Sequence, residues 1–184
     1  MTWHEWNART TETAPMHLAV EAYASSKDFC AIFAKEMGSL YGLALFLCAD
    51  HDRATRTFLA ALSDCLKSET VFKEQARSWS RRAIFKHALQ AMNPASPSAL
   101  TETPRREIAE QVGPQVRPLI GLSAFDRFVF AMLILERYST SECAALLGSD
   151  RKDIEAARQR ALRVLARDRG EAAPAPGRFG LAAA

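Results

Sequence analysis

Residues 122–166, which read LSAFDRFVFAMLILERYSTSECAALLGSDRKDIEAARQRALRVLA, decide the fold. Apolar residues recur every three or four positions over 123–138, 139–147 and 151–167, which is the spacing of amphipathic helices. Gly148 lies between the second and third segments, where glycine permits the left-handed turn that ends a helix. A short helix, a tight turn and a longer helix are typical of a helix-turn-helix, so the sequence predicts that motif here.

The last of these segments is basic. Between residues 151 and 169 the sequence has seven arginine or lysine residues against three aspartate or glutamate residues. This local excess of positive charge suits the neutralisation of DNA phosphates, although the formal charge of the whole chain is only +3. A solvated charged face on an ordinary helical hairpin is the alternative interpretation.

The first half of the chain also predicts helices and no sheet. Apolar residues follow helical spacing over 29–48, 54–65 and 71–92, so we expect three helices that pack as a small bundle. Five of the eight prolines lie between residues 94 and 118 and indicate a linker, with a short helix near 105–112.

The predicted fold class is therefore all-α, with two small domains. The five expected parts are a flexible N-terminal arm (1–28), a helical domain (29–92), a proline-rich linker (93–121), a helix-turn-helix domain (122–168) and a disordered tail (169–184). Whether the linker holds the domains apart or folds them together stays open. A closed arrangement that hides the DNA-facing helices is a hypothesis for the resting state.

Several function classes find no support in the sequence. The four cysteines lie in apolar helical patterns without a Cys-x-x-Cys pair, so we expect buried free thiols and no metal. The four histidines are scattered, and no nucleophile motif or glycine-rich phosphate loop is present, so we expect no enzyme and no cofactor. No basic, apolar leader opens the chain, and the longest apolar run, 43–49, is far below the ~20 residues that span a bilayer. The expected compartment is the cytoplasm, without membrane contact.

The second domain resembles a known family. Its sequence is similar to region 4, the C-terminal domain, of extracytoplasmic-function sigma factors of the sigma-70-like group, in which a helix leads into a Tyr-Ser-x-x-Glu-x-Ala-x-x-Leu-Gly run and then a recognition helix. The residues that match this run are Tyr138, Ser139, Glu142, Ala144, Leu147 and Gly148. In the first domain, residues 35–62 resemble the part of sigma region 2 that grips RNA polymerase, and residues 71–89 resemble its promoter-melting helix.

The resemblance implies a sigma-like transcription initiation factor that binds core RNA polymerase and promoter DNA, with an anti-sigma protein as a further partner. The implied DNA contacts are Ser141, Arg151, Lys152, Arg158, Gln159 and Arg160 in the second domain, and Arg77, Arg81, Arg82 and Lys86 in the first. The implied polymerase contacts are Asp52, Arg53, Arg56 and Leu59. Among these residues, Gln159 has the side chain suited to an adenine edge.

The sequence departs from the family at the polymerase contacts. Where the family has an acidic pair and a Gln-Glu pair, this chain has Thr55-Arg56 and Leu59-Ala60, so the charge is lost or reversed. In the recognition helix Glu155 replaces a basic residue, and a carboxylate near a phosphate opposes binding. The alternative is therefore a divergent sigma-like protein that no longer initiates transcription and acts as a DNA-binding regulator or a protein-interaction module.

Overall fold

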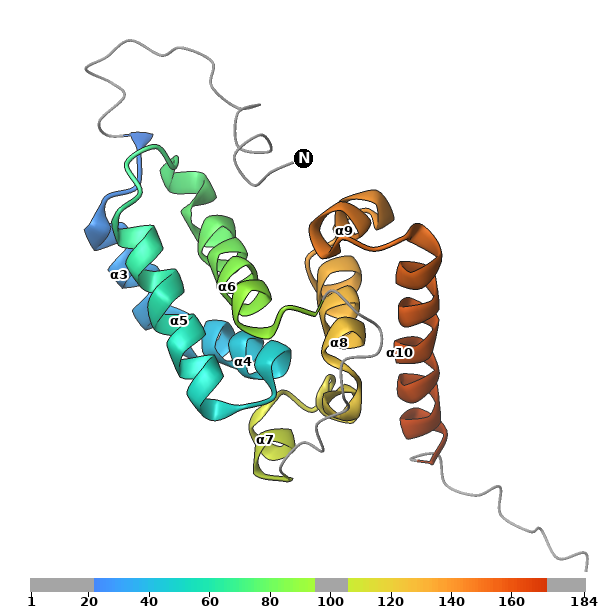
Figure 1. The fold of residues 1–184 in the computed structure, drawn as a ribbon. Helices are drawn as coiled ribbons and strands as arrows, with labels where there is room; N and C mark the ends of the chain where they lie inside the picture. The colour runs from blue at the N-terminus through green and yellow to red at the C-terminus, as the bar shows by residue number, and fades with distance from the viewer. Residues whose placement is uncertain (1–21, 95–105, 172–184) are drawn as a thin grey trace, which may run out of the picture.

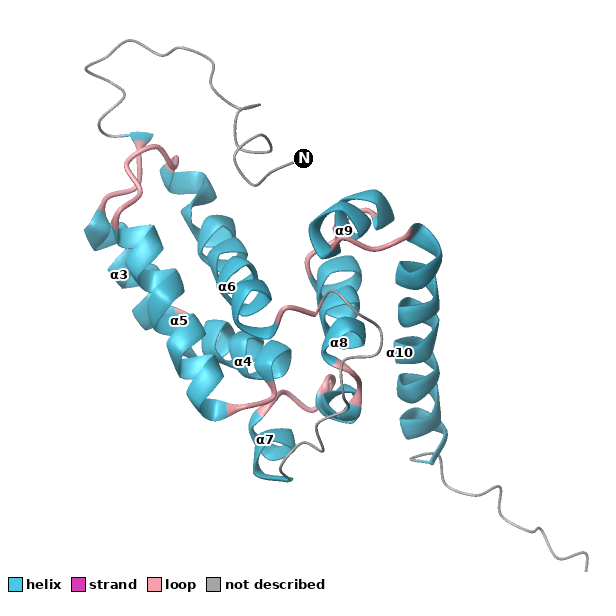
Figure 2. Ribbon diagram, in the orientation of Figure 1, coloured by secondary structure: helices cyan, strands magenta, loops and turns pink. Residues whose placement is uncertain are grey.

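The computed structural model describes residues 22–94 and 106–171. Within them the regular secondary structure is helical apart from one isolated β-bridge, which confirms the all-α class (Figure 2). Most of the expected arm (1–21), part of the expected linker (95–105) and most of the expected tail (172–184) lie outside the described residues. No single described helix is long and apolar enough to cross a membrane, although α3 and α4 together, as a bent pair, pass that test of length and composition.

Residues 22–94 form four α-helices rather than the expected three. They are α3 (Ser26–Lys35), α4 (Met37–Cys48), α5 (His51–Leu66) and α6 (Ala76–Met92). The prediction of one helix over 29–48 is wrong, because the backbone of Glu36 leaves the helical region (φ −108°, ψ 16°) and the axis bends by 77°. This break lets Phe29 and Phe33 of α3 and the apolar side chains of α4 enter the same core.

The third predicted helix begins later than its apolar pattern indicates. Phe72 forms an antiparallel bridge with Tyr23, their rings stack at 4.8 Å, and the Ala24 amide donates to the Val71 carbonyl at 2.6 Å. Val71 and Phe72 are therefore extended, and α6 starts at Ala76. The same contact fixes the last residues of the expected flexible arm, since Ala24 is buried.

The part of the expected linker that the structure describes is packed. Residues 106–121 contain α7 (Arg106–Gln111) and a 3₁₀ helix (Arg117–Gly121). The buried side chains in this segment are Ile108, Val112, Leu119 and Ile120. The short helix expected near 105–112 is present as α7. Residues 106–121 join the core, because their apolar side chains find partners on the neighbouring helices.

The second half has the three helices that the sequence predicts. They are α8 (Ala124–Phe130), which continues as a π-helical segment (Ala131–Leu135), α9 (Thr140–Leu147) and α10 (Arg151–Glu171). Ser139 and Glu142 form a capping box at the start of α9, in which each side chain accepts from the other residue's backbone N–H. Gly148 ends α9 with φ 60°, the left-handed turn expected of it.

The two halves pack against each other. Figure 1 shows α8 between α10 and the helices of the first half. The rings of Phe46 in α4 and Phe130 in α8 meet edge to face, with centroids 6.2 Å apart, and the buried guanidinium of Arg127 donates to the carbonyl of Leu47 at 3.2 Å. One cluster of buried apolar residues runs through both halves.

The two halves therefore share one core, an arrangement that we call closed. It covers part of α6, where Arg81 and Phe85 meet Glu136 and Tyr138, but it leaves one side of α10 exposed. The division into two domains stays a prediction.

Candidate nucleic-acid interface

The helix α10 has one buried face and one solvent face. Ile154, Ala157 and Ala161 are completely buried and hold α10 on the rest of the second half. Figure 1 places α10 at the edge of the molecule, so the opposite side of the helix faces away from the other helices. A helix fixed on one side and open along the other can enter the major groove of DNA.

The open side of α10, which we call the outer face, carries exposed side chains at helical spacing: Lys152, Gln159, Arg163 and Arg167. Among the described residues, the three cations of this set form no ion pair. Lys152 and Gln159 are expected contacts, whereas Arg163 and Arg167 were missed. The signal that could have found them is their spacing of eleven and fifteen residues from Lys152, which places all three cations on one side of the helix.

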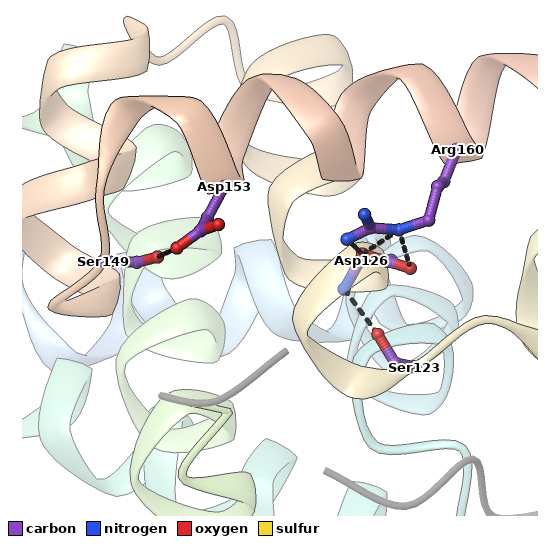
Figure 3. Close-up of polar contacts among 5 residues, drawn as sticks. All are labelled: Ser123, Asp126, Ser149, Asp153 and Arg160. Atoms are coloured by element: carbon purple, nitrogen blue, oxygen red, sulfur yellow. Dashed lines mark hydrogen bonds and ion pairs between the residues drawn. The ribbon is translucent and has the colours of Figure 1, made fainter. Parts of the chain in front are cut away.

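Arg160 is directed to a neighbouring helix instead of the outer face. Its Nη2 donates to Asp126 Oδ1 at 2.7 Å and its Nε donates to Oδ2 at 3.0 Å (Figure 3). The Asp126 side chain is only 7% exposed, and the first turn of α8 holds it in place because the Asp126 amide donates to Ser123 Oγ. The hydrogen bonding of the Arg160 guanidinium to the Asp126 carboxylate raises the pKa of Arg160 above its usual value. The structure thus shows a structural partner for Arg160, and its DNA contact stays a prediction.

Arg158 and Gln159 share one carboxylate. Arg158 Nη1 lies 3.4 Å from Glu155 Oε2, and Gln159 Nε2 donates to Glu155 Oε1 at 3.0 Å. The hydrogen bonds from Gln159 and Arg158 lower the pKa of Glu155, so this carboxyl group is ionised at neutral pH. The acidic residue that departs from the family pattern is therefore partly neutralised within α10 itself.

Three expected contacts lie together where α9 meets the start of α10. Arg151 Nη2 donates to Ser141 Oγ in α9, and both residues are exposed. Lys152 follows at the next position and is also exposed. The free amides of the first helical turn give this end of α10 a partial positive charge that adds to the two cations.

The basic residues of α6 are placed differently. Arg77 is bound to Glu36 at 2.6 Å, and Lys86 is bound to Asp64 at 2.7 Å. Arg81 forms an ion pair with Glu136, which connects α6 to the end of α8 in the other half. Three of the four expected DNA contacts of α6 are therefore held by carboxylates of the same molecule.

The fourth residue, Arg82, is half-buried beside an open cleft between α6 and the corner that joins α8 to α9. The cleft measures about 200 Å³, and its lining residues are Ser78, Arg82, Glu136, Arg137, Tyr138 and Glu142. Both positively and negatively charged side chains line the cleft, so it does not match the negatively charged phosphate backbone of DNA.

The expected polymerase contacts lie on α5. Asp52, Arg56 and Leu59 share its solvent side, and the Leu59 side chain is 56% exposed. Arg53 turns the other way, toward the end of α6, where its Nη1 lies 3.8 Å from Met92 Sδ. The structure thus brings three of the four residues onto one open surface.

The cysteines and histidines form no second site among the described side chains. Cys48, Cys65 and Cys143 are buried free thiols as expected, and burial raises the pKa of Cys65 to about 11 and that of Cys143 to about 12. The expectation for Cys30 is wrong, because it is exposed on α3. No group of three or more His, Cys, Asp or Glu residues in the described part of the chain could hold a metal ion.

No model of a known protein family, no curated protein and no solved structure matches this chain. The resemblance to sigma factors thus rests on the motif residues of the sequence.

Proposed function

We propose that this chain is a sigma-like transcription factor that binds duplex DNA through the outer face of α10. The observation that carries the proposal is the contrast between the two basic helices. Lys152, Arg163 and Arg167 form no ion pair with the described residues, whereas three of the four basic residues of α6 are held by carboxylates. Cations without an intramolecular partner are available to replace the counterions of DNA.

The length of the outer face suits a groove. Lys152 and Arg167 are fifteen residues apart, which corresponds to about 22 Å along an α-helix. The major groove is about 12 Å wide, so cations at the two ends of α10 reach the phosphates on either side of it. Gln159 lies between them, where a side chain faces the base edges.

The test is the salt dependence of duplex DNA binding, measured by fluorescence anisotropy with the full chain. Each phosphate contact contributes about one unit to the slope of log affinity against log salt, so Arg163→Ala and Arg167→Ala should each reduce that slope by about one. Arg77→Ala is the matched control, because Arg77 is an exposed arginine already paired with Glu36. Equal slopes for all three variants and the parent chain would contradict the proposal.

The resemblance further implies initiation of transcription with core RNA polymerase. What supports this form of the function is the open surface of α5, where Asp52, Arg56 and Leu59 lie together. What favours the alternative, a DNA-binding regulator that does not engage polymerase, is the closed arrangement. In that arrangement Arg81 is bound to Glu136 and not available to a promoter.

Gel filtration with bacterial core RNA polymerase separates the two forms. Co-elution that Leu59→Asp abolishes would support initiation through α5, with Ser63→Asp, on the same side of that helix, as a control for added charge. Failure to co-elute, with DNA binding intact, would leave the regulator.

A further inference from the structure

The network around Glu155 suggests how the outer face of α10 recognises sequence. A carboxylate on a DNA-facing helix opposes binding through charge alone, so its presence at this position calls for a reason. Here Glu155 accepts a hydrogen bond from Gln159 at 3.0 Å and lies 3.4 Å from the guanidinium of Arg158. The three side chains come from consecutive turns of the same helix, at the i, i+3 and i+4 spacing that brings them together.

This network fixes which way the Gln159 amide points. An ionised carboxylate has only acceptor atoms, so the NH₂ group of the amide must face Glu155. The carbonyl Oε1 and the second hydrogen of Nε2 are then left to point away from the carboxylate, on the exposed side of α10. A glutamate carboxyl is ionised at neutral pH, and the hydrogen bonds from Gln159 and Arg158 lower the pKa of Glu155 further, so this orientation holds at neutral pH.

The exposed pattern of one donor beside one acceptor matches a single base edge. In the major groove adenine presents the acceptor N7 beside the donor N6, which pair with the free Nε2 hydrogen and with Oε1 of a glutamine. Guanine presents two acceptors, N7 and O6, so a glutamine held in this way satisfies only one of them.

We propose that Glu155 is a positioning residue that holds the Gln159 amide ready to bind an adenine, with Arg158 neutralising the carboxylate. The proposal rests on the proposed DNA binding by α10. An ordinary surface hydrogen bond between residues four apart, with no effect on recognition, is the competing explanation, and it predicts a different outcome below.

The experiment is a selection from a randomised duplex library with the full chain, followed by affinity measurements on the selected sequence and its single-base variants. Gln159→Ala identifies the position that Gln159 reads, because the preference for adenine should disappear there. Glu155→Ala should reduce the preference at the same position by about fivefold or more, since a good bidentate contact discriminates by ~1–3 kcal/mol. The same variant should bind non-specific DNA more tightly than the parent chain, because it loses a negative charge. If Glu155 positions Gln159, Glu155→Ala should thus lose preference for adenine and gain affinity for non-specific DNA.

Two further variants complete the test. Glu155→Gln keeps an acceptor for Gln159 but not the charge, so it should retain more preference for adenine than Glu155→Ala. Lys152→Ala should weaken binding to every sequence by a similar factor and leave the preference unchanged, as expected of a phosphate contact.

The outcomes are distinct. Tighter non-specific binding by Glu155→Ala with an unchanged adenine preference would overturn the proposal, because Glu155 would then act through charge alone. The proposal would also be overturned if the parent chain selects no position at which the preference for adenine depends on Gln159. A parent chain that binds no duplex DNA at all would instead refute the proposed function itself.

Discussion

Arg160 and Asp126 offer the sharpest test of the structure, because the sequence and the structure assign Arg160 different roles. As a DNA contact, Arg160 should contribute to DNA affinity and little to stability. As the partner of Asp126, it should contribute mainly to stability. We therefore expect Arg160→Ala to lower the free energy of unfolding while leaving the salt slope of DNA binding unchanged.

The size of the effect follows from the burial of the two groups. Arg160 donates to both carboxylate oxygens, and removing it leaves the Asp126 carboxylate, only 7% exposed, without this partner. Breaking a fully buried pair costs ~3–5 kcal/mol. The Arg160 side chain is 39% exposed, so solvent screening reduces the expected loss to about 2 kcal/mol. For a chain of this size that loss corresponds to a fall in Tm of about 4–8 °C.

A double-mutant cycle in chemical denaturation measures the interaction. Arg160→Ala should be the least stable variant, and adding Asp126→Ala should recover part of the loss, because the stranded buried charge is then gone. Arg158→Ala is the matched control, because it is the same residue type on the same helix, in a half-exposed pair with Glu155 that solvent screens and that contributes little to stability. If Arg160→Ala is as stable as Arg158→Ala, or if Asp126→Ala recovers nothing in the Arg160→Ala background, the reasoning is refuted.

Three other predictions concern stability, reactivity and the turn. Burial raises the pKa of Asp64, but hydrogen bonds from Lys86 and His87 outweigh this effect, so the pKa lies below its usual value of 3.8. The stability that these bonds contribute is present above pH 3.8 and is lost as the pH falls through the lowered pKa of Asp64. Asp64→Asn should therefore reduce stability at pH 7 and flatten its acid dependence in denaturation series. A maleimide should label one thiol, Cys30, in the folded chain and all four after unfolding, as counted by mass spectrometry; rapid labelling of a second thiol would contradict the burial. Gly148→Ala should lower the free energy of unfolding by ~1–2 kcal/mol, because alanine is strained at φ 60°, while the added Cβ itself meets no atom within 4 Å. An unchanged Tm would count against this turn geometry.

The sequence predicts helices well where the determinants are local. The capping serines Ser123 and Ser139 and the turn at Gly148 act within one turn of their own helix, and the starts of α8 and α9 and the end of α9 agree with the predicted segments. The first segment, predicted to extend to 138, ends at Leu135. The break at Glu36 was not predicted, since the apolar spacing continues across it. The extended conformation of Val71 likewise depends on Ala24, which lies 47 positions earlier in the chain.

The same distinction between local and tertiary determinants explains which features of the candidate site could be predicted from the sequence. Helical periodicity alone separates the outer face, with Lys152 and Arg163, from the buried face of α10. What periodicity does not reveal is the partner of Arg160, because Asp126 is 34 residues away on another helix. Counting basic residues along the sequence therefore overestimates the number available to DNA.

The two basic helices, α6 and α10, differ in the free energy needed to expose their basic residues to DNA, and this difference bears on function. For α6 to bind DNA across the face where Arg81 meets Glu136, the two halves must separate, which also exposes the contact between Phe85 and Tyr138. Exposing a buried aromatic or aliphatic side chain costs ~1.5–3 kcal/mol, so this opening costs several kcal/mol before any DNA contact forms. The outer face of α10 carries no such cost. A partner that recruits α6 must therefore supply the opening energy through its own contacts, whereas the DNA binding that we propose for α10 needs no such opening. This asymmetry is the physical reason to test α10 with DNA alone and α6 only in the presence of polymerase.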